Sequence, residues 1–468
     1  MLKPQAAFDE PHHRLNLRPS MLNRTIFKLA APAIFECLMF SLVFFTDTLI
    51  VGWLQDETYL AGVALASLLM FWSSAPIQGM SIATTSIISR TWGEKDFSEA
   101  RRYAGHALAL TLIITAGILL IGESFASDLI RLLRAAPEVV PSATKYLRIV
   151  LLSSVLGVPL MVSNAVIRAK GDTTTPMAIT FSMNVINIVA SIILAFGIGP
   201  FPAMELYGVA LGTVIARNVG GFASLAVLAT KKRGINIRPT HLLRLSWKRI
   251  RRIWHVAYPA MTERVVNSTS YAFFMSMVAG LGTTLLAGHQ IALNVESLAF
   301  MPAFGMSVAV TTILGQAVGS GRYRIGEITV KRTIIFTVVF MFFLGILFVF
   351  FAPQAVKVFR ATPDVLQITG VALRIGALEF PFFALTFILM GALRGAGDTR
   401  SPMFINMSCI ILLRLPLTYL FAFVFHWGIV GVWLACATDW AGRAIGLAIV
   451  FQKGNWKLIH KNEKQKFA

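Results

Sequence analysis

The chain has 468 residues, of which 56% are hydrophobic and only 14% are charged. Soluble domains carry roughly a quarter charged residues, so this composition excludes an ordinary soluble globular protein and indicates an integral membrane protein. The formal net charge of +20 is also found in nucleic-acid-binding proteins, but its distribution along this chain favours a signal for membrane orientation.

Apolar stretches long enough to cross a bilayer recur along the whole chain. The first 24 residues are polar and lack the apolar core and cleavage site of a signal peptide. We therefore predict an all-α integral membrane protein with twelve transmembrane helices. They are centred on residues 25–53, 58–89, 103–125, 143–167, 175–198, 205–230, 253–280, 285–316, 329–352, 365–392, 402–425 and 429–451.

Lysine and arginine are concentrated in alternate loops. Most of them lie in the amino terminus, in the loops after the even-numbered spans and in the carboxyl tail. The opposite loops hold only Arg131, Arg134, Lys357 and Arg360. The positive-inside rule then predicts a multi-pass protein of the plasma (inner) membrane with both termini in the cytoplasm. The expected partner of this positive charge is the lipid bilayer, not nucleic acid.

Long segments of the sequence occur twice, at an offset of 226 or 227 residues. RAKGDTTTPM (168–177) matches RGAGDTRSPM (394–403), and GMSIATTSIISRTWG (79–93) matches GMSVAVTTILGQAVG (305–319). Because six spans return the chain to its starting side, we expect two parallel six-helix lobes. The expected boundaries are a segment 1–24, an N-lobe 25–235, a connector 236–252, a C-lobe 253–452 and a tail 453–468.

The duplicated RAKGDTTTPM motif falls at the turns after spans 4 and 10. Its glycine can supply a positive φ, its Asp or Thr can cap the next helix, and its proline suits a first helical turn. Its arginine lies near a helix carboxyl end, where positive charge is favourable. We interpret these turns as structural, with cytoplasmic gating as the alternative role. The residues are Arg168, Gly171, Asp172, Pro176, Arg394, Gly397, Asp398 and Pro402.

Ionisable residues inside spans are functional candidates because a charge is costly within a bilayer. Asp47 is the strongest candidate, since the repeat aligns it with Phe274 and it therefore belongs to one lobe only. Glu36 shares a helix face with Asp47, but it recurs as Glu263, which favours a shared structural role. Glu36, Glu379 and Asn184 are candidates for a substrate cavity, and Asp439 and Arg443 are expected to pair along their helix.

The sequence contains no recognisable catalytic constellation. It has no P-loop, so ATP-driven pumping is not predicted, and its eight histidines form no HxxxH pair inside a span. Cys37, Cys409 and Cys436 lie in apolar spans without a metal-ligand spacing. We expect a protein that is not an enzyme, holds no cofactor or metal, and draws energy from an ion gradient or acts passively.

Taken together, these features resemble the multidrug and toxic compound extrusion (MATE) family. The resemblance rests on Pro32 and Asp47 in span 1, the two motif copies and LAGHQIALNVESL (286–298). It implies antiport by alternating access, in which H⁺ or Na⁺ enters while an organic, mainly cationic and amphipathic compound leaves. It also implies a cation-coupling site in the first lobe at Asp47, Asn187 and Thr213, with Ser191 at a position where relatives carry a second Asp. Some relatives use acidic residues in spans 7 and 10, where this chain has Glu263 and Glu379.

Our hypothesis for the mechanism is exchange switched by protonation of Asp47, with a Na⁺ site at Asp47, Asn187 and Ser191 as the alternative. A second possible function is a flippase for lipid-linked oligosaccharide or polysaccharide precursors, whose anionic substrate would suit Arg264, Arg374 and Arg414. A channel or a membrane scaffold is a third. A monomer is expected because one chain holds both lobes.

Overall fold

The computed structural model describes residues 15, 19–54, 56–230, 235–356 and 361–466, and every regular element in these ranges is a helix. The N-lobe consists of α1 (Leu22–Trp53), α2 (Glu57–Gly93), α3 (Phe97–Leu132), α4 (Val140–Leu151), α5 (Ser154–Ala169), α6 (Thr174–Phe196) and α7 (Glu205–Ala229). The short α8 (Pro239–Leu243) follows. The C-lobe consists of α9 (Trp247–Ala279), α10 (Thr283–Gly319), α11 (Tyr323–Val356), α12 (Pro363–Gly376), α13 (Phe380–Ala396), α14 (Arg400–Cys409), α15 (Leu415–Tyr419), α16 (Gly428–Lys453) and α17 (Trp456–Lys466).

Several spans are interrupted instead of running as one straight helix. A 3₁₀ turn, Ala377–Glu379, joins α12 to α13, and two π-helical segments, Ile410–Arg414 and Leu420–Val424, flank α15. Helices α4 and α5 bend by 49° at their junction. Bends and π segments of this kind are common at functional positions of membrane helices.

The described helices agree with the predicted membrane class. Ten of them are long and apolar enough to cross a bilayer, or eleven if the bent pair α4 and α5 is one span. Helix α9 is the remaining predicted span. It has 33 residues, but the cationic start of its sequence and its polar segment around Asn267 make it less apolar. The helix also begins at Trp247, inside the stretch expected to be connector, so span 7 extends beyond its apolar part.

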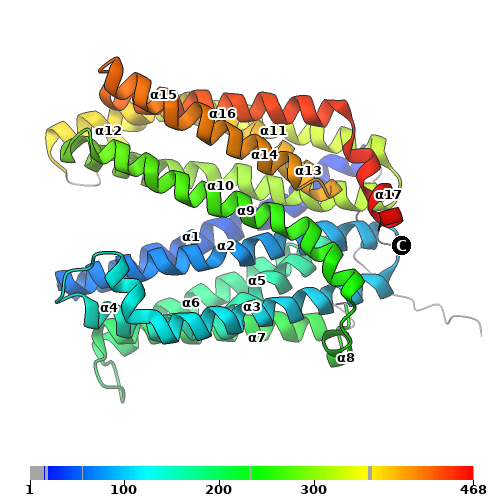
Figure 1. Cartoon of the computed structure of the whole chain (residues 1–468), viewed down its shortest axis with the longest axis horizontal. Coiled ribbons are helices and arrows are strands. Elements are labelled where there is room, and N and C mark those ends of the chain that lie inside the picture. The colour runs from blue at the N-terminus through cyan, green and yellow to red at the C-terminus, as the bar shows by residue number, and fades with distance from the viewer. Residues whose placement is uncertain (1–14, 16–18, 55, 231–234, 357–360, 467–468) are drawn as a thin grey trace, which may run out of the picture.

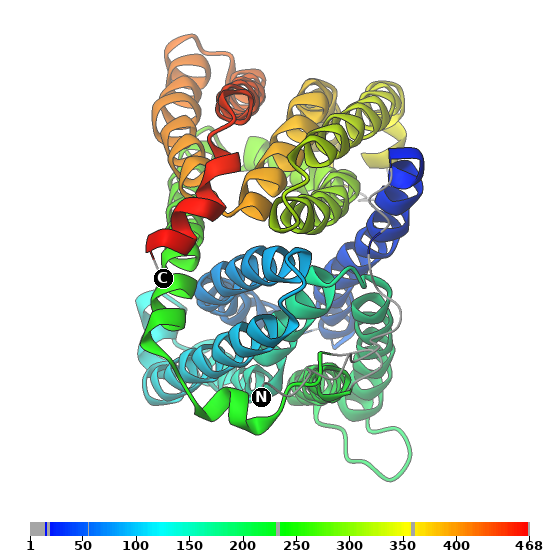
Figure 2. The same ribbon diagram turned by 90° about the vertical axis from the view of Figure 1, so that its right-hand side faces the viewer.

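The two lobes lie side by side as two bundles of nearly parallel helices (Figure 2). Contact between them comes mainly from α1 packing on α10 and from α2 packing on α9 and α10. Two glycines at equivalent repeat positions allow this close approach. A Cβ on Gly79 would lie 2.3 Å from the Met261 side chain, and a Cβ on Gly305 would lie 2.6 Å from the Ile34 Cα. The pairs are related by the repeat, so the interface has approximate twofold symmetry.

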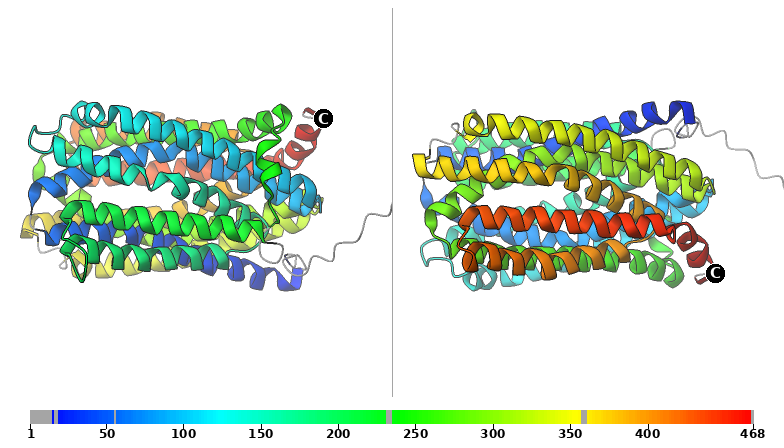
Figure 3. Two further views of the ribbon diagram at one scale, coloured as in Figure 1. Left: turned by 90° about the horizontal axis from the view of Figure 1, so that it is seen from below. Right: turned by 90° about the horizontal axis from the view of Figure 1, so that it is seen from above.

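Hydrogen bonds between the lobes occur at the end of the molecule that carries α8 and α17 (Figures 1 and 3). Ser86 Oγ donates to the Arg394 carbonyl at 2.5 Å, and Thr312 Oγ1 donates to the Arg168 carbonyl at 3.2 Å. Ser86 and Thr312 occupy equivalent repeat positions, as do the two arginines. Gln316 Nε2 adds a bond of 2.8 Å to the Ala169 carbonyl. We call this the closed end, because here the lobes satisfy each other's helix-terminal carbonyls.

Candidate ion-coupling site

Three of the predicted coupling residues meet inside the N-lobe. Asp47 on α1, Asn187 on α6 and Thr213 on α7 are all buried, with exposed fractions of 8%, 1% and 2%. Thr213 Oγ1 donates to Asp47 Oδ2 at 2.9 Å, and Asn187 Nδ2 donates to Thr213 Oγ1 at 3.1 Å. Residues far apart in the sequence thus form one chain of hydrogen bonds that ends on a carboxylate.

Two oxygen atoms of this cluster are not used by the protein. Asp47 Oδ1 and Asn187 Oδ1 are both buried and lack a hydrogen-bond partner. A buried acceptor without a partner is costly, and native structures normally satisfy such atoms. Carboxylate, amide and hydroxyl oxygens are also the ligands that hard cations prefer. The cluster therefore has the chemistry to accept a proton or a small cation.

The structure separates the other two predicted N-lobe residues from this hydrogen-bond chain. Ser191 Oγ donates to the Val209 carbonyl at 3.4 Å and lies against Gly212, one residue before Thr213. Asn184 Nδ2 donates to the Met39 carbonyl at 2.6 Å and so ties α6 to α1. Ser191 is therefore a neighbour of the cluster, and Asn184 a bridge one to two turns away.

Glu36 and Glu263, the repeated carboxylates, each form an ion pair with the arginine of their own lobe's motif. Arg168 Nη1 lies 2.7 Å from Glu36 Oε1. Arg394 Nη2 donates to both oxygens of Glu263, at 2.9 and 2.8 Å, and Asn406 adds a bond of 2.6 Å. Unlike Asp47, these carboxylates have a fixed counter-charge. Such ion pairs are what the shared structural role favoured by the repeat would require, and both that role and a coupling role for Glu263 stay predictions.

Both motif turns have the local geometry that the sequence predicted. Gly171 and Gly397 have φ angles of 101° and 103°, a region that favours glycine because it has no Cβ. Asp172 Oδ1 accepts from the amides of Thr174 and Thr175 at 3.1 and 3.0 Å. In the second copy Asp398 accepts from the Ser401 amide at 2.9 Å. Pro176 and Pro402 fall in the first turns of α6 and α14.

A second group of buried charges lies in the C-lobe, apart from Asp47. Asp439 lies 2.8 Å from Arg443, the pairing expected from their spacing, and 2.9 Å from Arg414, which the sequence did not predict. Glu379, in the 3₁₀ turn, is 2% exposed and its Oε1 has no hydrogen-bond partner. The same holds for Glu296 on α10, which is 4% exposed. Glu379 thus remains a candidate, but it is not part of the N-lobe cluster.

A family model named MatE matches residues 32–193 and again residues 259–420. The chain belongs to the MATE family. The two matches correspond to the two lobes and together cover most of the chain. The protein is accordingly a multi-pass membrane transporter and not an enzyme, as the sequence predicted.

Curated relatives and a solved structure agree with this assignment. The chain is 30% identical over 441 residues to the "Probable multidrug resistance protein NorM" of Thermotoga maritima, and the match covers 93% of both chains. It is 26% identical to the "FAD transporter" of Shewanella oneidensis, over 88% of this chain and 90% of that one. The Vibrio cholerae MATE transporter VcmN, in its bent form, superposes with a TM-score of 0.86 at 21% identity, covering 96% of this MATE chain and 99% of the other.

Two charged residues of this MATE transporter escaped prediction from the sequence. Arg90 on α2 is completely buried, and its partner Glu463 on α17 is 5% exposed. The sequence did contain a signal for Arg90, because the repeat aligns this charged residue with the neutral Gln316. An unmatched buried charge in one lobe drew attention to Asp47, and the same comparison would have found Arg90.

Proposed function

We propose that this transporter exports organic compounds in exchange for H⁺ or Na⁺, with Asp47 as the residue that couples the two movements. One observation carries the proposal: the buried Asp47 carboxylate has an oxygen without a hydrogen-bond partner. Among the described residues, Asp47 is also found in no ion pair, whereas Glu36 and Glu263 are. A charge at this position is costly unless something neutralises it.

Competition for this one negative charge accounts for exchange. When a proton or Na⁺ occupies Asp47, the carboxylate is neutralised and no longer attracts an organic cation. When the ion leaves, the negative charge returns and the cation can bind again. Thr213 and Asn187 hold the carboxylate in place through both states. Coupling requires no more than this mutual exclusion, together with two alternating states of the lobes.

The names of the relatives support export of diverse compounds. The relative from Thermotoga maritima carries a multidrug-resistance name, and the one from Shewanella oneidensis is named for FAD, which is anionic. We infer a multidrug substrate range for this chain and expect cationic compounds to be preferred because of Asp47. The flippase alternative is not favoured, since neither relative carries a name that indicates lipid-linked sugars.

We further propose that the closed end faces the cytoplasm. The loops at that end carry most of the lysines and arginines, as the positive-inside rule requires. The hydrogen bonds from Ser86 and Thr312 hold the lobes together there. In this arrangement the protein is closed toward the cytoplasm, and these bonds must break for substrate to enter from inside.

The experiment uses the protein reconstituted in liposomes of known orientation. Efflux of ethidium is driven by a pH gradient and, separately, by a Na⁺ gradient, for wild type and Asp47→Asn. We expect one of the two gradients to drive efflux in the wild type. In Asp47→Asn the efflux rate should fall roughly tenfold or more, because Asn cannot carry the exchanged charge. The gradient that works identifies the ion.

Asp128→Asn is the matched control, since Asp128 is an exposed carboxylate on α3. It should transport like the wild type. Gradient-driven efflux that survives in Asp47→Asn would overturn the role of Asp47 and direct attention to Glu263 and Glu379. A parallel assay with an anionic flavin dinucleotide tests the charge preference. Transport of the flavin alone would contradict the proposed cationic substrate class.

A further inference from the structure

The approximate symmetry of the closed end is broken at one pair of equivalent positions. Gln316 is neutral and donates to the Ala169 carbonyl of the opposite lobe. Its counterpart Arg90 is charged, with an exposed fraction of 0%. The Arg90 guanidinium packs against the motif turn of the opposite lobe: a Cβ added to Gly397 would lie 2.4 Å from Arg90 Nη1. A buried arginine in this place requires a counter-ion that the repeat itself does not supply.

Helix α17 supplies that counter-ion, and it is firmly attached to the C-lobe. Gly454, with a φ of 74°, ends α16 and lets the chain turn into α17. Trp456, 1% exposed, stacks on Phe451 with a centroid distance of 5.2 Å and donates to its carbonyl at 3.1 Å. Lys457 pairs with Glu327 of α11 at 2.5 Å. The helix therefore moves with the C-lobe.

The other face of α17 bonds to the N-lobe. Glu463 Oε2 lies 2.9 Å from Arg90 Nη1 of α2 in the N-lobe, and also 3.4 Å from Arg252 Nη2 of α9 in the C-lobe. His460 Nε2 bonds to Glu94, the residue immediately after α2, and its Nδ1 lies 3.5 Å from Arg90 Nη1. Two side chains one turn apart on α17 thus bind two N-lobe residues at the end of α2, Arg90 in its last turn and Glu94 just beyond it.

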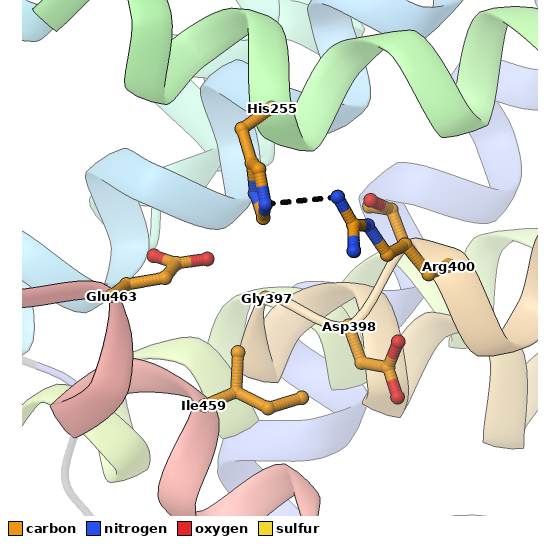
Figure 4. Close-up of a pocket in the computed structure, with 7 residues that line it drawn as sticks. His255, Gly397, Asp398, Arg400, Ile459 and Glu463 are labelled. Atoms are coloured by element: carbon orange, nitrogen blue, oxygen red, sulfur yellow. Dashed lines mark hydrogen bonds between the residues drawn. The ribbon is translucent and has the colours of Figure 1, made fainter. Parts of the chain in front are cut away.

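These contacts border the second motif turn. Glu463 and Ile459 of α17, His255 of α9 and the turn Gly397–Arg400 line a pocket of about 180 Å³. Figure 4 shows the Glu463 carboxylate directed into this pocket, opposite the bonded pair of His255 and Arg400. Glu463 Oε1 is buried without a hydrogen-bond partner. The tail helix, the motif turn and the lobe interface therefore meet at one place.

We propose that α17 is a gate of the transport cycle: Glu463 and His460 hold the α2 end of the N-lobe against the C-lobe and so keep the cytoplasmic end closed. The proposal rests on the alternating-access function inferred above. Separation of the lobes at this end pulls Arg90 and Glu94 away from α17. In the open state water replaces α17 as the partner of Arg90 and Glu94. The free energy of opening therefore depends on how strongly α17 binds these two residues.

The test measures the distance between the lobes at the closed end directly. Ser98 of α3 and Arg324 of α11 are exposed and occupy equivalent repeat positions. Spin labels are attached at these two positions after Cys37, Cys409 and Cys436 have been replaced by alanine, and the protein is placed in lipid nanodiscs. Glu463→Gln leaves Arg90 buried without its counter-ion, so we expect the population with the longer distance to rise roughly tenfold.

Two matched variants make the result specific to the gate. Lys461→Gln changes an exposed charge on the same helix and should leave the distance distribution unchanged. The double variant Arg90→Gln with Glu463→Gln gives the N-lobe the neutral residue found at Gln316, and should return the distribution most of the way to wild type. If Glu463→Gln does not fold, Glu94→Gln, at a half-buried position, replaces the carboxylate that bonds to His460 with a neutral amide, which weakens this contact and should raise the open population several-fold.

A wild-type distance distribution in folded Glu463→Gln or Glu94→Gln protein overturns the proposal. An equal opening in Lys461→Gln also overturns it, because the effect would then follow from charge on α17 in general. The distance measurement needs no substrate or gradient. If the wild type fails to transport, the proposed function fails, while the distances still decide whether α17 holds the closed end together.

Discussion

At the scale of single residues, buried carboxylates in this protein fall into two classes. Glu36 and Glu263 are neutralised by an arginine at 2.7 and 2.8 Å, whereas Asp47 accepts a bond from a neutral hydroxyl and keeps one oxygen unused. Removing one partner of a buried ion pair leaves an uncompensated charge, which is a cost to stability. An uncommitted carboxylate is available for exchange. The two classes therefore predict different effects of amide substitution.

Glu263→Gln should lower the stability of the protein by about 3 kcal/mol, because the partly buried Arg394 is left without its carboxylate. The double variant Glu263→Gln with Arg394→Gln should recover most of that loss. Asp47→Asn should change stability little while abolishing coupling. Thermal unfolding in detergent, measured alongside vesicle transport, separates these outcomes. If Glu263→Gln is stable but no longer coupled, Glu263 takes part in ion exchange.

His460 predicts a dependence on pH at the closed end. Burial lowers the pKa of His460 below its ordinary 6.5, an effect that the hydrogen bond to Glu94 opposes. Glu463, Arg90 and Arg252 are the other charged groups around it. Since the docked state binds a proton less readily than the free state, docking of α17 is strongest above about pH 6.5 and weakens as the pH falls below that value.

Limited proteolysis of the tail at Lys457 and Lys461 between about pH 7.5 and pH 5 measures this effect. Relative to cleavage of an unstructured lysine peptide by the same protease at each pH, cleavage of the tail should speed up on acidification in the wild type. In His460→Gln this relative rate should be the same at all pH values in that range, because Gln does not titrate. A pH response that persists in His460→Gln would assign the effect to another group.

At the scale of structural elements, the duplicated motif turns are equivalent in backbone but not in surroundings. A Cβ added to Gly171 would lie 2.9 Å from the Leu15 side chain, whereas a Cβ added to Gly397 would lie 2.4 Å from the Arg90 guanidinium. Leu15 is an apolar side chain that can rotate away. Arg90 is held by Glu463 and by the Ser86 carbonyl. The second turn is therefore part of the lobe interface.

We expect Gly171→Ala and Gly397→Ala each to cost about 1–3 kcal/mol, since alanine is strained at the positive φ of both turns. Gly397→Ala should be the more harmful and should also loosen the closed end, because the added methyl displaces Arg90. Melting temperatures and the Ser98–Arg324 label distance report the two effects. Equal melting temperatures and equal label distances in the two variants would show that Arg90 can move aside without a loss of stability.

At the scale of the whole molecule, two pseudo-symmetric hydrogen bonds join the lobes. Ser86→Ala and Thr312→Ala each remove one of them. Each loss is worth about 0.5–1.5 kcal/mol, so the ratio of open to closed protein should rise roughly two- to tenfold in either variant. Thr333→Ala removes a buried hydroxyl that bonds within α11 and is the control. A change in Thr333→Ala as large as in the others would contradict this account.

The sequence by itself determined the membrane class, the two parallel lobes, the motif turns and the choice of Asp47 as a candidate, whereas the meeting of Asp47 with Asn187 and Thr213 was implied only by the resemblance to the MATE family. These features follow from local rules: apolar length, positive φ at glycine, and a repeat that exposes unmatched residues. Only the tertiary structure decided which carboxylates are neutralised, because Glu36 and Glu263 meet arginines that lie 132 and 131 residues away in the sequence. It likewise decided that the polar tail folds into α17 and reaches Arg90. The sequence of a charged helix looks the same whether the helix is exposed to water or packs its charges against buried charges of opposite sign. Only the tertiary packing distinguishes these two cases.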